Sequence, residues 1–328
     1  MKKIINGIDD IERELLEGLV AASPNRIRKL GSKNIVVRQN LNFNKVALVG
    51  GGGSGHEPAH AGYVGYGMLD CAVAGNIFTS PPAIDVLEGI LEVATTKGTL
   101  CIAKNYTGDV MSFELAIEMA KQHGVDNVDM VVVNDDIAMA TNVAGRRGVA
   151  GTILVHKITG AAAETGADLE MVKSIAQRTI DNVRTIGVAI GPCTVPAVGH
   201  PSFQIPENEM ELGIGIHGEP GIRREQIANA DGIVKKMIDR LLTFLEYAGN
   251  EVILLINGMG ATPMMELLIV NKFAKEYLYR NGVTVYDTMI GNYMTSIDMA
   301  GFSMTLLKLD DTLRAFYDAS ADTFAWKK

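Results

Sequence analysis

The sequence is poor in cysteine and tryptophan, with three cysteines and one tryptophan in 328 residues. Cys71, Cys101 and Cys193 are widely spaced and form no C-x-x-C pair, which argues against a disulfide framework or a structural zinc site. No run reaches about 18 consecutive apolar residues without a charge, the length at which a membrane span is suspected. These absences predict a protein of the reducing cytoplasm with no membrane contact.

Positive charge is also scarce, because 30 Lys and Arg residues stand against 38 Asp and Glu residues and leave a net charge of −8. Nucleic-acid binding draws most of its affinity from clustered basic side chains, so we expect no direct nucleic-acid partner. Asp9, Asp10, Glu12 and Glu14 occupy the N-terminal segment where an export signal needs an uninterrupted apolar stretch. The composition therefore favours a small-molecule ligand.

The length and the pattern of apolar residues predict two α/β domains with mostly parallel or mixed sheets. We place the boundary after residue 185, which gives an N-terminal domain of residues 1–185 and a C-terminal domain of residues 186–328. Runs rich in β-branched residues alternate with segments whose apolar residues recur at helical spacing. They predict strands at 34–39, 45–50, 99–105, 128–135, 185–191, 251–258, 283–291 and 302–309, and helices at 8–22, 83–96, 112–123, 149–165, 169–184 and 263–279.

The stretch GGGGSGHEPAH, residues 50–60, matches two unrelated motifs. Its glycines satisfy the G-x-G-x-x-G pattern of a dinucleotide-binding turn, but the acid that would hold the ribose has only Asp70 as a candidate, with no clear strand before it. A nucleotide-hydrolase loop would need a lysine after the last glycine. The H-E-x-x-H zinc motif from His56 to His60 is interrupted by Pro58, and no established helix precedes it.

Two interpretations of this stretch remain. A strand that ends in a glycine-rich turn with His56 at its tip suits close approach of the backbone to a small ligand. The alternative is an ordinary tight turn.

The second candidate loop is AKNYTGDVMSFE, in which a predicted strand ends at Lys104 and Asp109 precedes a predicted helix. The carboxyl end of a parallel strand faces the ligand crevice, which favours a binding role for both residues. Asp109 is equally consistent with an N-terminal helix cap, and Lys104 with a surface charge.

The third candidate loop is GIGIHGEPGI, residues 213–222, in which glycines enclose His217 and Glu219 follows. The glycines leave the imidazole room to reach outward, so His217 is a poor candidate for core filler. Glu219 either orients the ring or is a solvated acid. Three polar loop tips predict a single site.

Longer motifs carry a resemblance to a known family. GGGSGHEPAHAGYVGYGMLDCAVAGNIFTSPP, KNYTGDVMSFE, AGRRGVAGT, GIGIHGEPGI, NGMGATPMMEL and TSIDMAGFSMTLLKLDD resemble, in this order, the substrate-binding subunit of bacterial dihydroxyacetone kinase. The resemblance spans essentially the whole chain. It implies two α/β domains, a homodimer and a site that takes dihydroxyacetone as a covalent hemiaminal on a histidine.

The resemblance implies roles for individual residues. By motif, the hemiaminal histidine is His217. His56 and Asp109 match positions that contact the ligand's hydroxyl groups, where they can draw off a proton as a phosphoryl group arrives. The implied substrate contacts are Gly53, Ser54, Gly55, His56, Lys104, Asp109 and His217.

The resemblance also implies an obligatory partner, because this chain has no nucleotide loop. We expect a nucleotide-binding kinase subunit that carries ADP or ATP and Mg²⁺ and is recharged by a phosphohistidine carrier. No cofactor or metal is expected on this chain itself.

Two segments depart from the kinase pattern. The loop IAMATNVA, between Asp136 and Gly145, is about two residues shorter and lacks an expected Tyr-Thr pair, and Pro82 stands where the kinase subunits usually have threonine. The family includes a paralogue that senses dihydroxyacetone and binds a DNA-binding transcription regulator as a co-activator of the kinase operon. This co-activator role is the alternative prediction.

Overall fold

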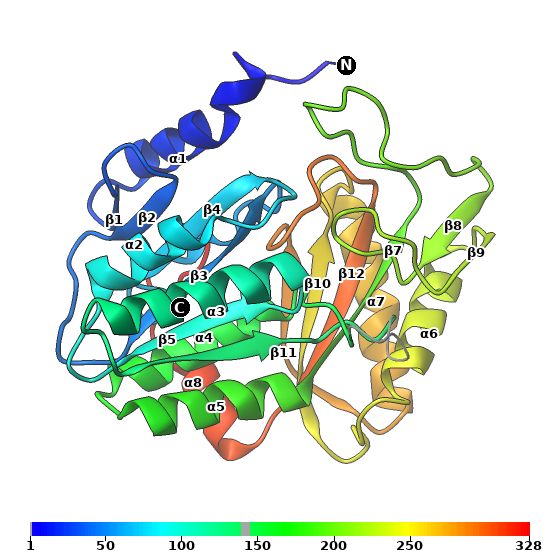
Figure 1. Cartoon of the computed structure of the whole chain (residues 1–328). Coiled ribbons are helices and arrows are strands. Elements are labelled where there is room, and N and C mark those ends of the chain that lie inside the picture. The colour runs from blue at the N-terminus through cyan, green and yellow to red at the C-terminus, as the bar shows by residue number, and fades with distance from the viewer. Residues whose placement is uncertain (1, 139–144) are drawn as a thin grey trace. The chain divides into compact units, whose positions relative to one another are not determined.

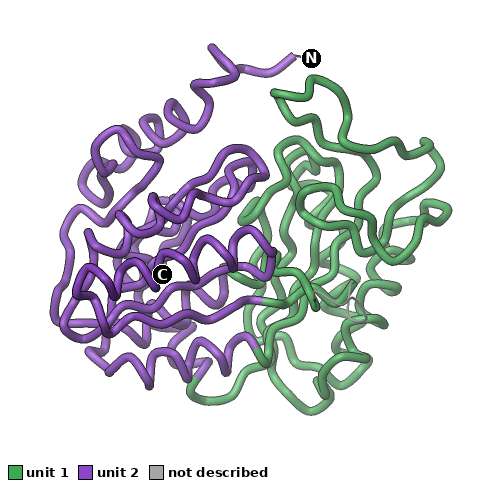
Figure 2. The backbone as a smooth tube through the Cα atoms, in the orientation of Figure 1, with its two compact units in different colours: residues 1, 134–152, 181–312 green, residues 2–133, 153–180, 313–328 purple. Residues whose placement is uncertain are grey.

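The computed structural model describes residues 2–138 and 145–328. The chain divides into two compact units (Figure 2). Unit 1 contains residues 134–152 and 181–312, and unit 2 contains residues 2–133, 153–180 and 313–328. Each unit is built around one six-stranded sheet. Across the described residues, no helix combines the length and the apolar character that crossing a bilayer requires.

The sheet of unit 2 has the strand order β1-β2-β4-β3-β5-β6. Its four strands β4, β3, β5 and β6 run parallel, and β2 is antiparallel to both of its neighbours. The parallel strands end at the same edge, which is where α/β sheets bind ligands. The strands are β1 (Ile27–Lys29), β2 (Ile35–Arg38), β3 (Ala47–Ser54), β4 (Cys71–Ile77), β5 (Thr99–Lys104) and β6 (Val128–Val133).

Helices cover both faces of this sheet. The helices α2 and α3 lie on one face (Figure 1), where their buried apolar side chains pack against Ala47 and Val49 of β3. On the other face His156 of α4 packs so closely that its Cε1 atom would lie 3.3 Å from a Cβ atom on Gly50. The helices wholly or mainly in unit 2 are η1 (Ile8–Asp10), α1 (Ile11–Ala22), η2 (Ala61–Tyr63), α2 (Ala83–Val93), α3 (Thr107–Gln122), α4 (Thr152–Glu164), α5 (Leu169–Asn182) and α8 (Asp311–Asp318).

The sheet of unit 1 has the order β11-β10-β12-β7-β8-β9 and is mixed. β10 and β11 run parallel, whereas the pairs β10–β12, β12–β7, β7–β8 and β8–β9 are antiparallel. The buried faces of α6 (Ala230–Leu241) and α7 (Met264–Arg280) pack against this sheet. The strands are β7 (Val183–Ala189), β8 (Glu209–Leu212), β9 (Arg223–Gln226), β10 (Glu251–Gly258), β11 (Thr284–Gly291) and β12 (Gly301–Lys308).

The structure confirms the predicted two-sheet α/β class and each predicted strand and helix, with end shifts of a few residues. The sequence analysis missed β1, β4, β8, β9, α6 and α8. The predicted boundary after residue 185 differs from the observed division, because the chain passes between the units near residues 134, 153, 181 and 313. One reason is that Asp135 and Ile137 exchange backbone hydrogen bonds with Thr185 of β7, which ties their segment to unit 1.

Helix α4 depends on the absence of a side chain at Gly160. A Cβ atom there would lie 2.4 Å from both the Gly67 carbonyl oxygen and the Met68 Cα atom. We expect Gly160→Ala to lower the free energy of unfolding by about 1–3 kcal/mol, because backbone has to move. Gly18→Ala on α1 is the matched control, since a Cβ atom there meets nothing within 4 Å. It should raise stability by up to about 1 kcal/mol. Urea unfolding measures both, and equal effects would contradict this packing argument.

Candidate functional site

The glycine run belongs to strand β3 itself, so the predicted turn after residue 50 is wrong. β3 continues through Ser54, and its glycines pair with β4. A Cβ atom on Gly52 would lie 2.3 Å from Lys104 Nζ, and one on Gly53 would lie 2.7 Å from the Thr79 amide nitrogen. The glycines therefore let a buried ammonium and a neighbouring loop pack directly against the strand's backbone.

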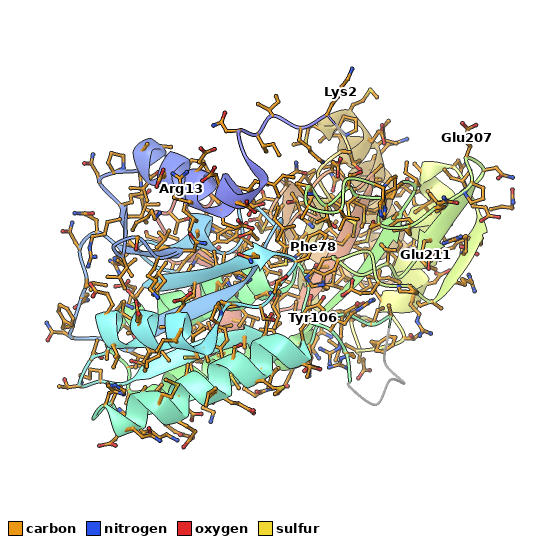
Figure 3. All side chains as sticks on the ribbon, turned by 45° about the horizontal axis from the view of Figure 1, so that its top comes forward. Lys2, Arg13, Phe78, Tyr106, Glu207 and Glu211 are labelled. Atoms are coloured by element: carbon orange, nitrogen blue, oxygen red, sulfur yellow. The ribbon has the colours of Figure 1, made fainter. Side chains whose placement is uncertain are left out.

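His56 lies just beyond the end of β3 and is fully buried. Its ring stacks on Phe78, with 5.1 Å between the ring centroids and 20° between the planes. Phe78 and Tyr106, labelled in Figure 3, follow the carboxyl ends of β4 and β5. Ser54 Oγ donates to the Gly75 carbonyl at 2.7 Å, and the Gly55 amide donates to Glu57 at 3.0 Å. The predicted residues of this loop are thus held at the ligand edge of the sheet.

The two competing motif interpretations do not match this geometry. Residues 56–60 form turns rather than an α-helix, so His56 and His60 do not lie one helical turn apart. Asp70 immediately precedes β4, where it accepts hydrogen bonds from Lys45 Nζ and the Leu48 amide. Asp70 therefore has a structural role. Among the described residues, no group of three or more His, Cys, Asp or Glu side chains is placed to hold a metal ion.

Lys104 and Asp109 form a buried ion pair at the carboxyl end of β5. Lys104 Nζ lies 3.1 Å from Asp109 Oδ2, and the two side chains are 1% and 4% exposed. The surface-charge alternative for Lys104 is therefore wrong. The cap alternative for Asp109 is also wrong, because α3 begins at Thr107 and its N-cap residue is Tyr106. Asp109 instead lies in the first turn, where the helix dipole favours a negative charge.

Two further histidines extend this pair: His60, which the sequence analysis considered only as part of a zinc motif, and His156, which it did not consider. His60 Nε2 lies 3.4 Å from Lys104 Nζ, and His60 Nδ1 lies 3.0 Å from His156 Nε2. Burial and the neighbouring Lys104 charge hold the pKa of His60 well below its usual value and lower the pKa of His156 to about 3. Both rings are therefore neutral at physiological pH. Their chemistry depends on the fold, since the two lie 96 positions apart in the sequence.

In unit 1, Glu219 orients the ring of His217. Glu219 Oε1 lies 2.8 Å from His217 Nδ1, and Glu219 Oε2 accepts a hydrogen bond from the His217 amide at 2.9 Å. Burial alone would raise the pKa of Glu219, but His217 and the nearby charge of Arg147 lower it to about 2. The orienting role left open in the sequence analysis is thus the one that the structure shows. His217 itself is partly exposed, with 20% of its side chain accessible.

Arg147 and Glu211 hold the ends of the His217 loop. Arg147 Nη2 donates to the Gly213 carbonyl at 2.9 Å, and its Nε atom donates to Asp136 at 2.7 Å. Glu211, labelled in Figure 3, accepts from the Gly221 amide at 2.9 Å. The sequence analysis assigned no role to Arg147, although it lies in the quoted motif AGRRGVAGT. Its pairing with a buried carboxylate could be found only from the fold.

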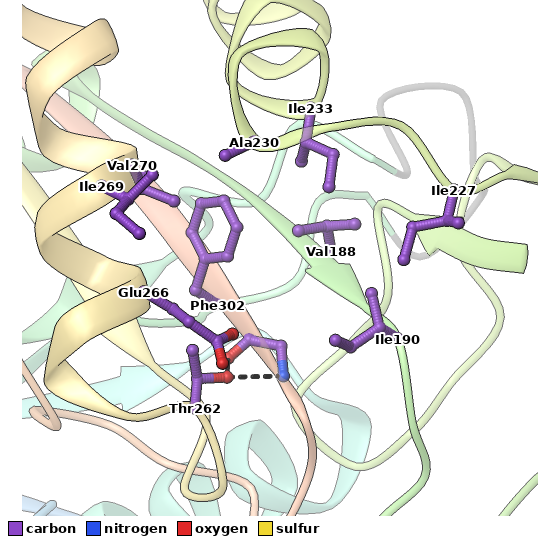
Figure 4. Close-up of a pocket in the computed structure, with 11 residues that line it drawn as sticks. Val188, Ile190, Ile227, Ala230, Ile233, Thr262, Glu266, Ile269, Val270 and Phe302 are labelled. Carbon is purple, nitrogen blue, oxygen red and sulfur yellow. Dashed lines mark hydrogen bonds between the residues drawn. The ribbon is translucent and has the colours of Figure 1, made fainter. Parts of the chain in front are cut away.

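A separate apolar pocket of about 210 Å³ lies in unit 1, between α6 and α7 (Figure 4). Thr262 and Glu266 are the polar side chains of its lining. The Thr262 hydroxyl already forms hydrogen bonds with the carbonyl and the amide of Gly301. The lining contains no histidine, lysine or cysteine. The predicted site residues all lie outside this pocket.

The two departures from the kinase pattern lie in different situations. Pro82 is the N-cap residue of α2, and its carbonyl accepts from the amides of Asp85 and Val86 at 3.0 and 3.1 Å. A proline suits the start of a helix, where no amide donor is needed. Most of the short loop after Asp136 falls outside the described residues.

These features define a class of protein. The chain is a two-unit α/β protein with a buried Lys-Asp-His cluster at the carboxyl ends of the parallel strands of one sheet. Its other unit carries a glycine-enclosed histidine oriented by a carboxylate. Both have the chemistry expected of a site that holds a small polar ligand.

Comparison with known proteins identifies the family. The Dak1 domain family matches residues 17–325. The dihydroxyacetone-binding subunit of a PTS-dependent dihydroxyacetone kinase from Listeria innocua is 48% identical, over 99% of this chain and 100% of that protein. The chain therefore belongs to the Dak1 family, that of the substrate-binding subunits of dihydroxyacetone kinase.

Solved structures agree with this assignment. The dihydroxyacetone kinase of C. freundii, in complex with AMP-PNP and Mg²⁺, matches with a TM-score of 0.94 and 37% identity, over 99% of this chain and 61% of that chain. A dihydroxyacetone kinase operon co-activator matches with a TM-score of 0.92 and 36% identity, over 98% of this chain and 99% of that chain. The fold is thus shared by a kinase and by a co-activator.

The Glu219 contacts predict a specific acid sensitivity. Because the pKa of Glu219 falls from its ordinary value of 4.5 to about 2 on folding, its ionised form stabilises the folded state. This contribution is fully present above about pH 4.5 and is lost as the pH falls toward 2. After allowance for solvent screening it is on the order of 1 kcal/mol. Glu219→Gln should therefore flatten the decline of unfolding free energy between about pH 5 and 3, measured by urea unfolding. The exposed Glu207→Gln is the control, and an unchanged slope in Glu219→Gln would exclude this role.

Proposed function

We propose that the chain is the dihydroxyacetone-binding subunit of a dihydroxyacetone kinase and captures the triose as a hemiaminal on His217. The observation that carries this proposal is the 2.8 Å contact between His217 Nδ1 and Glu219 Oε1. The relatives' shared identity as kinase subunits or kinases supports the choice of substrate.

The Glu219 contact selects the reactive atom of His217. A carboxylate only accepts hydrogen bonds, and Glu219 stays ionised down to about pH 2. The ring proton therefore belongs on Nδ1, which puts the lone pair of the neutral ring on Nε2. Nε2 is then the nucleophile, and the carboxylate stabilises the positive charge that develops on the ring during attack.

The addition balances without loss of water. The Nε2 lone pair forms a bond to the ketone carbon while the carbonyl π electrons move to oxygen. Overall the ring gives up its Nδ1 proton and the oxygen gains one, so the adduct has the mass of chain plus triose. Glycerol has no carbonyl carbon to attack, and bond formation itself therefore discriminates the ketose from the polyol.

Phosphoryl transfer is assigned to the groups of unit 2. Asp109 and His56 are proposed to draw the proton from a ligand hydroxyl as the phosphoryl group arrives, while Lys104, Gly53, Ser54 and Gly55 contact the ligand. Asp109 is suited to this role because it lies at the ligand edge of the sheet.

The phosphoryl donor is proposed to come from a partner subunit that carries ADP or ATP with Mg²⁺. The described residues offer no lysine-containing phosphate loop, and β3 uses its glycines to pack against Lys104 and Thr79. A phosphohistidine carrier would recharge the partner. The functional state of this chain is proposed to be a homodimer.

Capture is tested directly with ¹³C-labelled dihydroxyacetone. In the wild-type chain the carbonyl carbon should become tetrahedral in the NMR spectrum, and intact mass should rise by one unmodified triose. His217→Ala should abolish both signals, because it removes the nucleophile. The exposed His200→Ala, in the same unit, is the matched control and should retain them. A tetrahedral adduct that persists in His217→Ala would refute the assignment.

Asp109 is tested with the complete system of ADP-loaded partner, carrier and dihydroxyacetone. Asp109→Asn should keep the ¹³C adduct but lower the kcat of phosphoryl transfer by roughly 10²- to 10⁴-fold, the usual range for loss of a general base. Asp126→Asn, an exposed acid beyond α3, is the control. Unchanged turnover in Asp109→Asn would remove it from the base role.

A co-activator function is the second candidate, favoured by the fit to the operon co-activator's structure. Capture on His217 is common to both functions, whereas only the kinase must deliver bound triose to a nucleotide subunit. The complete system distinguishes them. Formation of dihydroxyacetone phosphate supports the kinase, and its absence together with a triose-dependent complex with a DNA-binding regulator supports the co-activator.

A further inference from the structure

The Lys104–Asp109 pair continues into a hydrogen-bonded chain of two buried histidines. The contacts are Lys104 Nζ to His60 Nε2 at 3.4 Å and His60 Nδ1 to His156 Nε2 at 3.0 Å. His60 and His156 are 6% and 0% exposed. The chain ends at His156 Nδ1, which is buried and makes no hydrogen bond within the described part of the protein.

The charges fix the direction of this chain. A neutral Lys104 would leave the buried Asp109 carboxylate unpaired, so Lys104 is an ammonium, which donates and cannot accept. His60 Nε2 must then accept, which places the His60 proton on Nδ1. His60 Nδ1 donates to His156 Nε2, and the His156 proton is left on Nδ1. The opposite direction would set an N–H of His60 against the ammonium.

The unpaired His156 Nδ1 shows that the two tautomers are set by Lys104. A buried N–H without an acceptor costs stability, and His156 Nδ1 carries that cost. If both tautomers were reversed, His156 Nδ1 would carry a lone pair instead of a proton. His60 Nε2 would then carry a proton that points at the Lys104 ammonium, so two donors would face each other. His156 Nδ1–H is therefore left without an acceptor because the two rings are protonated so as to offer an acceptor to the Lys104 ammonium.

We propose that His60 and His156 are positioning residues that hold the Lys104 ammonium in place beside Asp109. One hydrogen of the ammonium is directed to Asp109 and another to His60. The backbone of Gly52 closes a third side, because a Cβ atom there would lie 2.3 Å from Lys104 Nζ. The effect of His60 and His156 on turnover rests on the proposed function, whereas their hydrogen bonds and tautomers do not.

The tautomers are tested without any activity. In ¹H–¹⁵N spectra of the side chains, His60 and His156 should both carry the proton on Nδ1, and Lys104 should give an ammonium signal protected from solvent exchange. In His156→Leu the His60 Nδ1–H loses its acceptor, which should release the His60 ring from the Lys104 ammonium. The protection of Lys104 should then fall at least about ten-fold, as expected when the charge-assisted hydrogen bond to His60 is weakened. A His60 proton on Nε2 in the wild type, or unchanged protection in His156→Leu, would overturn the proposal.

A conservative variant separates positioning from mere packing. Glutamine at position 156 can accept from His60 Nδ1, so His156→Gln should keep Lys104 protected, whereas His156→Leu should not. In the complete system the kcat of His156→Leu should fall at least about ten-fold, with the His217 adduct retained and His156→Gln within about three-fold of wild type. The exposed His123→Gln is the control.

The outcomes remain distinguishable if a variant or the function fails. Equal losses of kcat in His156→Leu and His156→Gln would point to packing and overturn the proposal. If His156→Leu does not fold, the proposal is tested by the tautomers of the wild type and by the protection of Lys104 in His156→Gln. If the wild type forms neither adduct nor product, the proposed function fails, and the spectra still decide whether the histidines hold Lys104.

Discussion

The buried ion pair between Lys104 and Asp109 is the constraint on which the ligand edge of unit 2 depends. Removing both charges from water is costly, and the cost is offset only when each charge has a partner at good distance. The 3.1 Å contact meets that condition, and the first turn of α3 adds a favourable dipole. The pair also explains the glycines of β3, because only a strand without a side chain at Gly52 leaves space for the ammonium.

In unit 1, contacts within and beside a loop hold the side chain of His217 in place. His217 lies in a glycine-enclosed loop, which by itself would leave the ring in many orientations. The carboxylate of Glu219 contacts both the ring and the amide of the same histidine, while Arg147 ties the loop's start to Asp136. Glu219 and Arg147 thus hold the His217 ring and the start of its loop in place.

Membership in the Dak1 family rests on a match over nearly the whole chain, and the same fold occurs in a kinase and in an operon co-activator. Family membership therefore narrows the choice of ligand but does not distinguish a kinase subunit from a co-activator. The orientation of His217 is consistent with the proposed capture in either case, because the proposal gives both functions the same first bond.

The sequence by itself determined the two-sheet α/β class, the principal strands and helices, and the loops that carry His56, Asp109 and His217. Apolar periodicity and loop composition are local properties, which is why they were readable. It did not reveal the glycine run as a strand, because a strand without side chains shows no alternating pattern. It also missed His60, His156 and Arg147 as site residues. Their roles come from contacts between segments far apart in the chain and from burial, which sets their protonation, and only the tertiary structure decides both.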